Sequence, residues 1–186
     1  MDLIDNIKRV LNKDGVIIYP TDTILGLGCL PTHERAVTKI KRLKGRDTSK
    51  GLILLATDLS QVSAYLLPTE PEKQHLREGT LLNSEQPTTW IINAKPNVLP
   101  WLTAGDNTLA IRFAKLPWLQ NVCERVGALV STSVNLSGYA PALETKTARD
   151  LVGPQVDLVI HKRIASTGKP SVIRRAVDGS IIRGNE

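Results

Sequence analysis

The fold class is decided by one stretch near the N-terminus, Gly15-Val16-Ile17-Ile18-Tyr19-Pro20-Thr21-Asp22-Thr23-Ile24-Leu25-Gly26-Leu27-Gly28. Its apolar run, Val16–Tyr19, predicts a short strand that is buried on both faces. Pro20 ends this strand because proline has no N–H to donate to a neighbouring strand. Thr21–Gly28, rich in threonine and glycine, then predicts a loop. A buried strand that ends in a polar loop is typical of an open α/β sheet, where ligands collect at strand ends.

Outside this stretch, short apolar strands alternate with amphipathic helices along the chain. Helices are expected at residues 2–12, from an N-cap at Thr32 through Leu43, at 70–82, from Leu116 to Gly127 and after Thr145. Strands are expected at Leu52–Ala56, Thr88–Asn93, Thr108–Phe113, Ala128–Thr132 and Val156–Ile160, followed by a hairpin of Val172–Val177 and Ser180–Arg183 about an Asp178-Gly179 turn. This alternation predicts an α/β fold with a mixed sheet covered by helices on both faces.

Length and composition fit one globular unit. The chain has 186 residues, so a single domain over 1–186 is expected. Its 41% hydrophobic and 23% charged residues are ordinary globular values and argue against disorder. Two cysteines cannot build a disulfide framework. The longest apolar runs are too short to cross a bilayer and no signal peptide follows Met1-Asp2, so we expect a cytoplasmic protein.

The charge is basic and uneven. The formal net charge is +6, and a cationic stretch contains Lys39, Lys41, Arg42, Lys44, Arg46 and Lys50. Such a stretch fits a polyanion, but it fits equally a site for one phosphorylated small molecule. Aromatic residues make up only 4% of the chain, too few for a platform on which single-stranded nucleic acid stacks. Charge alone therefore leaves the partner open.

Several common chemistries have no motif in this sequence. A phosphate-binding P-loop would need a glycine where Arg163 stands, and Pro170 follows Lys169 where the loop needs Ser or Thr. No strand is followed by a dinucleotide-binding glycine motif, and no Cys/His spacing matches a zinc site. A serine-hydrolase elbow is also absent. The sequence thus disfavours these classes.

Polar segments remain at the ends of predicted strands. Thr21–Thr23 follows the first strand, Lys44 and Arg46 end the second helix, and Ser131–Asn135 continues a later strand. Each has a structural explanation, since helices favour cations in their last turn and Ser, Thr and Asn are common in turns. Together, however, hydroxyls and an amide would face several cations across strand ends, with Arg112 nearby. That combination suits a nucleotide phosphate bound beside a small carboxylate.

At these residues the sequence resembles the YrdC/Sua5 family of threonylcarbamoyl-AMP synthases. The matching motifs, in order, are Pro20–Thr23 through Gly28, Lys44-Gly45-Arg46, Lys50–Leu54, Leu109–Arg112, Ser133-Val134-Asn135, Pro170–Ile173 and Ile182–Gly184. They run over nearly the whole chain. The length is similar to the short bacterial form, which lacks an additional C-terminal domain.

The resemblance implies a reaction and a fold. L-threonine, bicarbonate or CO2, and ATP would give L-threonylcarbamoyl-AMP and pyrophosphate, and partner enzymes would pass the threonylcarbamoyl group to adenosine 37 of tRNA. The implied fold is a twisted, mixed, open α/β sheet flanked by helices, with a concave basic cleft. Mg²⁺ would accompany ATP, without a dedicated protein metal site.

The resemblance also assigns roles to residues. Lys44 and Arg46 would be catalytic, holding phosphates and stabilising the departing pyrophosphate. ATP or the adenylate would be bound by Lys50, Thr89, Ser133, Asn135 and Arg183. Threonine would be bound by Thr21, Arg112, Ser131 and Ser171, with Arg112 pairing its carboxylate. If Lys44 and Arg46 point only at ligand, their alanine variants should lose pyrophosphate formation without losing thermal stability.

One segment departs from the family pattern. Where the family carries Trp-Pro-Gly-Pro-x-Thr, this sequence has Ser84-Glu85-Gln86-Pro87-Thr88-Thr89 and keeps only the second proline and the final threonine. A different class of function also stays open, namely an RNA-binding module with the same fold that uses the basic stretch 39–50 and has no adenylate chemistry. RNA binding through about six phosphates would weaken roughly a thousandfold between 50 and 200 mM salt, whereas enclosed ATP chemistry would change much less.

Overall fold

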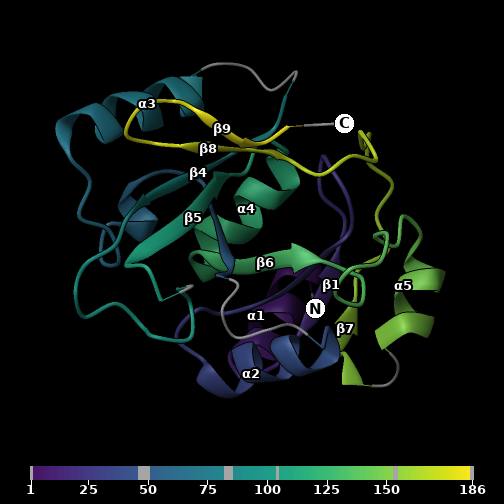
Figure 1. Ribbon diagram of the computed structural model, residues 1–186. Helices are drawn as coiled ribbons and strands as arrows, with labels where there is room; N and C mark the ends of the chain where they lie inside the picture. The colour runs from purple at the N-terminus through teal and green to yellow at the C-terminus, as the bar shows by residue number, and fades with distance from the viewer. Residues whose placement is uncertain (1, 46–50, 82–85, 104, 153–154, 185–186) are drawn as a thin grey trace.

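The computed structural model describes residues 2–45, 51–81, 86–103, 105–152 and 155–184 (Figure 1). The helices are α1 (Leu3–Leu11), α2 (Glu34–Leu43), the 3-10 turn η1 (Ser60–Val62), α3 (Glu70–Leu81), α4 (Pro117–Val126) and α5 (Thr145–Val152). The strands are β1 (Ile17–Tyr19), β2 (Gly26–Cys29), β3 (Ile53–Ala56), β4 (Thr88–Asn93), β5 (Thr108–Phe113), β6 (Leu129–Ser133), β7 (Leu158–Val159), β8 (Val172–Arg175) and β9 (Ile181–Arg183).

The described strands form one open, mixed sheet in the order β7-β1-β2-β6-β3-β5-β4-β8-β9. Neighbours are parallel at β1/β7, β3/β5 and β4/β8. They are antiparallel at β1/β2, β2/β6, β3/β6, β4/β5 and β8/β9. The predicted mixed α/β sheet is therefore confirmed, including the C-terminal hairpin, which adds β8 and β9 at one edge.

One sequence prediction is wrong. The end of the predicted loop Thr21–Gly28 is strand β2, which lies in the interior of the sheet between β1 and β6. Glycine has little intrinsic preference for strands, so the local sequence points away from this assignment. The strand forms because its backbone finds hydrogen-bonding partners on both sides, with Gly26 opposite both Tyr19 and Ser133.

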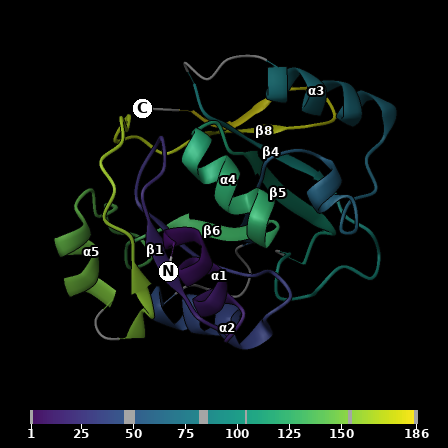
Figure 2. The same cartoon turned by 180° about the vertical axis from the view of Figure 1, so that it is seen from behind.

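Helices cover the sheet on both faces because successive strand side chains point to opposite sides. Ile17 and Tyr19 of β1 pack in a core that includes residues of α1 and α4. Ile18 of the same strand packs in a second core that includes residues of α2, α3 and α5. Figure 2 shows α1 and α4 in front of the sheet, on the face turned away in Figure 1. The fully apolar β1 segment is thus explained by burial on two sides.

Gly28 is required by close packing. A Cβ on Gly28 would lie 2.4 Å from the Val130 carbonyl oxygen and 2.8 Å from Cε1 of Tyr19. We expect Gly28→Ala to lower the free energy of unfolding by about 2–3 kcal/mol, because overpacking here forces backbone movement. Urea denaturation tests this, with Gly184→Ala as control since nothing lies within 4 Å of a Cβ there. Equal free energies of unfolding for the two variants would contradict the claim that a Cβ at Gly28 clashes with Val130 and Tyr19.

Candidate active site

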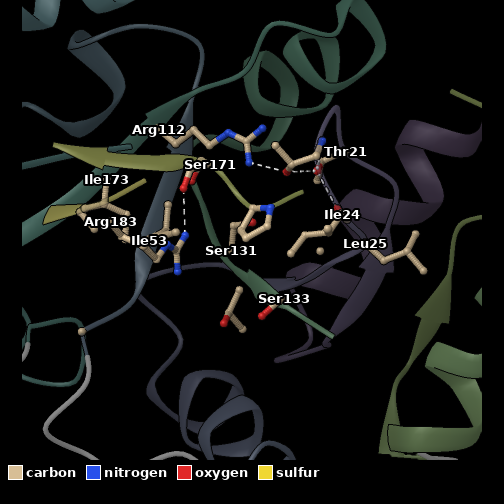
Figure 3. Close-up of a pocket in the computed structure, with 16 residues that line it drawn as sticks. Thr21, Ile24, Leu25, Ile53, Arg112, Ser131, Ser133, Ser171, Ile173 and Arg183 are labelled. Atoms are coloured by element: carbon tan, nitrogen blue, oxygen red, sulfur yellow. Dashed lines mark hydrogen bonds between the residues drawn. The ribbon is translucent and has the colours of Figure 1, made fainter. Parts of the chain in front are cut away.

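A hollow of about 180 Å³ lies on the face of the sheet that also carries α1 and α4. Figure 3 shows it at the junction of several strands and of the loop that follows β1. It is lined by small and polar residues together with two arginines: Thr21, Thr23, Ile24, Leu25, Gly26, Gly51, Ile53, Ala110, Arg112, Ser131, Thr132, Ser133, Pro170, Ser171, Ile173 and Arg183. Its volume suits a ligand of amino-acid size better than a whole nucleotide, since drug-sized ligands occupy about 300–1,000 Å³.

The hollow exists because the strand residues beyond α1 and α4 become small or polar. In β6, Leu129 belongs to the core against these helices, whereas Ser131 and Ser133 line the hollow. These three residues share one face because the side-chain period of a strand is two. Ser131 lies opposite Gly28 on one side and Ile53 on the other. The sheet therefore changes from core to ligand-accessible surface within a single strand.

Arg112 anchors one side of the hollow. It comes from β5, and only 8% of its surface is exposed. Its guanidinium donates to a carboxylate oxygen of Asp22 and, at 2.8 Å, to Oγ1 of Thr23. Burial lowers the pKa of Arg112, and the charge of Asp22 opposes that shift. The buried cation is thus held in place by the loop after β1, with further N–H groups in a planar fork suited to a carboxylate.

The loop hydroxyls form a chain whose hydrogen-bond direction is fixed. Thr21 Oγ1 donates to the Ile24 carbonyl at 2.6 Å, so it must accept from Thr23 Oγ1 at 2.9 Å and from the Thr23 backbone N–H at 3.1 Å. Thr23 Oγ1 in turn accepts from Arg112. A hydroxyl has one donor and two acceptor positions, so that of Thr21 is fully used by the protein. Thr21 shapes the loop, and its side chain borders the hollow.

The segment after β7 closes over this loop. The backbone N–H groups of Thr167 and Gly168 donate to the carbonyls of Asp22 and Thr23 at 3.0 and 2.9 Å, and the Ser166 hydroxyl donates to the Thr23 carbonyl. The structure therefore adds Asp22, Thr23 and Ser166 to the site architecture. Asp22 and Thr23 lie inside a motif already quoted, whereas Ser166 carries no local signal because its contact spans most of the chain.

Lys44 lies at the C-terminal end of α2 and is 2% exposed. Its Nζ donates to the carbonyl oxygens of Ser133 and Asn135, the latter at 3.0 Å, and to Asn135 Oδ1 at 2.6 Å. Oδ1 also accepts from the Ser133 hydroxyl at 2.6 Å, while Nδ2 of Asn135 donates to the Tyr139 carbonyl. The ammonium group thereby fixes the orientation of the Asn135 amide, because only the amide oxygen can face it.

The opposite side of the hollow is formed by β8 and β9. Ser171 Oγ and Thr89 Oγ1 lie 2.7 Å apart and are both buried. Arg183 from β9 donates to the Ser171 carbonyl at 2.9 Å (Figure 3). Burial lowers the pKa of Arg183, whose guanidinium is partly exposed at the rim. Thr89 is fully buried, and its hydroxyl contacts the hollow's lining through Ser171.

The predicted site residues fall into three groups: some line the hollow, some contact its lining, and some lie outside the described residues. Lining the hollow are Thr21, Arg112, Ser131, Ser133, Ser171 and Arg183. Three others, Lys44, Thr89 and Asn135, contact lining residues without lining the hollow themselves. Arg46 and Lys50 lie outside the described residues, as do Ser84 and Glu85 of the segment that departs from the family pattern. Within that segment, Thr88 Oγ1 donates to the Gln86 carbonyl at 3.1 Å.

A second, larger hollow of about 830 Å³ adjoins the first and shares Thr21, Ile24 and Leu25 with it. Cations border it at Lys146, Lys162 and Arg163. The predicted basic character of the cleft therefore comes partly from segments other than the stretch 39–50.

Among the residues that the structure describes, no three His, Cys, Asp or Glu side chains gather as a metal site. No helix among them is long and apolar enough to cross a membrane.

Comparisons with known proteins agree on one family. The Sua5/YciO/YrdC family profile, described as telomere recombination, matches residues 9–184. A threonylcarbamoyl-AMP synthase from Nitrosococcus oceani is 38% identical over 176 residues, 94% of each chain. The crystal structure of E. coli YciO matches with a TM-score of 0.84 and 26% identity, over 98% of this chain and 89% of that one. The P. abyssi Sua5 structure with L-threonine has a TM-score of 0.86 and 19% identity, over 98% and 54%.

Fold and site together define an α/β protein with an open mixed sheet that presents a buried arginine and several hydroxyls to a small polar hollow. The chain belongs to the Sua5/YciO/YrdC family. The twisted open-sheet fold implied by the sequence resemblance is confirmed by the two structural matches.

Proposed function

We propose that this protein is a threonylcarbamoyl-AMP synthase, which makes L-threonylcarbamoyl-adenylate and pyrophosphate from L-threonine, bicarbonate or CO2, and ATP. The observation that carries the proposal is near full-length similarity to relatives with that name, at 38% and 35% identity for two of them. The hollow around Arg112 supports it, since it has the size and charge for one amino acid.

The proposed chemistry needs positioning more than a protein nucleophile. The threonine amine and bicarbonate condense to a carbamate with loss of water, and a carbamate oxygen attacks the α-phosphate of ATP. The bond from the α-phosphorus to the bridging oxygen breaks, and pyrophosphate leaves. Phosphoryl chemistry of this kind is accelerated chiefly by orientation and by neutralising charge on the departing group. Enclosure also protects the carbamate and the mixed anhydride from water.

Roles for individual residues follow from the site. We assign the threonine carboxylate to Arg112, with Ser131 and Ser171 beside it and Thr21 shaping the loop. The adenylate is assigned to Ser133, Asn135 and Arg183, with Thr89 acting through Ser171. Arg46 and Lys50 are assigned to the phosphates on the strength of the sequence motif. For Lys44, the contacts to Ser133 and Asn135 favour a positioning role over direct phosphate binding.

Substrates and partners complete the proposal. Mg²⁺ would enter with ATP as part of the substrate. The unstable adenylate would be consumed by enzymes that transfer the threonylcarbamoyl group to tRNA, and we propose the cytoplasm as the site of both reactions. The alternative of an RNA-binding module is less well supported, because Lys39 pairs with Asp157 at 2.7 Å and Lys44 is buried. The described part of the basic stretch is therefore largely engaged by the protein.

Pyrophosphate release from ATP tests the proposal. Purified protein is expected to release pyrophosphate only when L-threonine and bicarbonate are both present. L-serine, L-valine and omission of bicarbonate serve as controls. Release that is independent of the amino acid, or RNA binding that falls steeply with salt in the absence of any release, would contradict it.

A further inference from the structure

The side chain of Tyr19 extends across β2, over Gly26 and Gly28, toward the candidate site. Tyr19 ends β1 opposite Gly26 of β2. A Cβ on Gly26 would lie 2.8 Å from Cζ of the Tyr19 ring, and one on Gly28 would lie 3.2 Å from its Oη. The ring therefore occupies the space that side chains of β2 would fill. Gly28 pairs with Ser131 of β6, which lines the hollow, so the Tyr19 hydroxyl lies on the side of β2 that faces β6.

The Tyr19 hydroxyl is buried without a partner. The residue is 0% exposed, and its Oη has no hydrogen bond within the described parts of the chain. A buried donor left unsatisfied is costly and uncommon in folded proteins. Burial raises the pKa of this phenol, while the Ser131 hydroxyl and the charge of Arg112 act to lower it. The two hydroxyls are thus neighbours, although they do not meet in hydrogen-bonding geometry in this structure.

Ser131 is one of two serines lining the hollow whose proton is not committed to a fixed acceptor; the other, Ser171, shares its hydrogen bond with Thr89 in either direction. The proton of Thr21 is taken by the Ile24 carbonyl, that of Thr23 by Thr21, and that of Ser133 by Asn135. For Ser131, no hydrogen bond of this kind is formed in the segments that the structure describes, and the neighbouring group that can share its proton is the Tyr19 hydroxyl. Figure 3 shows Ser131 between Arg112 and Ser133, and all three line the hollow.

We propose that Tyr19 is a positioning residue for amino-acid binding, which donates its phenolic proton to Oγ of Ser131 and so directs the Ser131 proton into the hollow, toward the bound amino acid. A hydroxyl that accepts one hydrogen bond keeps its own proton available for a second. This arrangement gives the buried phenol a partner when substrate is bound. It rests on the proposed function, in which the hollow holds L-threonine.

The test compares wild-type protein with Tyr19→Phe, Ser131→Ala, the double variant and the matched control Tyr65→Phe, which removes a half-buried hydroxyl outside the hollow. L-threonine binding is measured by calorimetry without ATP, and KM and kcat by pyrophosphate release. We expect Tyr19→Phe and Ser131→Ala each to weaken binding about five- to tenfold, the usual loss for one hydrogen bond. KM should rise similarly, with kcat within about twofold.

Two further signatures separate positioning from a structural role. The double variant should bind no more weakly than Ser131→Ala, because both changes remove one donor. Tyr19→Phe should keep or raise the thermal midpoint, since it deletes an unsatisfied group. Wild-type affinity in Tyr19→Phe, or additive losses in the double variant, would overturn the inference. Wild-type protein that neither binds L-threonine nor releases pyrophosphate would instead overturn the proposed function, so the two failures are distinguishable.

Discussion

Replacing Arg112 by glutamine is expected to weaken L-threonine binding by about 100-fold or more and to lower stability by about 3 kcal/mol. Removing one partner of a buried charge pair commonly costs about 2–5 kcal/mol, because the remaining charge is left unpaired. Here Asp22 would lose its cation, and a bound carboxylate would lose the same group. Calorimetry with L-threonine and urea denaturation measure the two effects.

The double variant Asp22→Asn/Arg112→Gln separates binding from folding. Without either charge, the loop should regain most of the lost stability, while L-threonine binding stays weak because no cation remains for the carboxylate. Asp22→Asn alone should keep Arg112 for the ligand and bind L-threonine at least as tightly as wild type. Normal L-threonine affinity in Arg112→Gln would remove this arginine from the site.

Replacing Lys44 by methionine is expected to reduce both stability and activity. Methionine keeps most of the aliphatic stem but leaves three oxygen acceptors, on Ser133 and Asn135, without the ammonium group. Hydrogen bonds to charged groups contribute about 1.5–3 kcal/mol each in favourable cases, so a net loss of about 2–3 kcal/mol follows. We expect the thermal midpoint to fall by about 5–10 °C and kcat by about 100-fold.

Lys8→Met is the matched control for Lys44→Met, since Lys8 is exposed in the last turn of α1. It should leave both quantities near wild type. If Lys44→Met lost pyrophosphate release with an unchanged thermal midpoint, the ammonium would act on ligand directly, as the sequence motif alone predicts. The stability measurement therefore decides between positioning and direct catalysis.

The sequence predicts much of the fold because hydrophobic periodicity survives in its strands. β4 and β5 match their predicted ranges, Thr88–Asn93 and Thr108–Phe113. β4 is rich in β-branched and aromatic residues, and β5 alternates Leu109, Ile111 and Phe113 on one buried face. β2 was not predictable locally, because its glycines form a strand only when neighbours pair with them and the Tyr19 ring covers them. Tertiary packing overrides propensity there.

In the candidate site, too, some features are predictable from the sequence and others depend on tertiary packing. That Arg112, Ser131 and Ser171 share one site is predicted by the family motifs that contain or adjoin them, and all three line the hollow. Two features depend on side-chain geometry that spacing does not encode, namely the pairing of Arg112 with Asp22 and the burial of Lys44 against Asn135. Asp22 and Asn135 are polar residues in loops, where one sequence allows several hydrogen-bond arrangements.

The most direct test of the account is the identity of the product. Purified protein is incubated with Mg-ATP, L-threonine and ¹³C-bicarbonate, and the nucleotides are resolved by mass spectrometry. We expect a species with the mass of AMP joined to N-carboxythreonine by loss of water, carrying one ¹³C and appearing together with pyrophosphate. If ATP stayed intact and that species did not form, synthesis of threonylcarbamoyl-AMP by this chain would be contradicted, whether or not L-threonine binds.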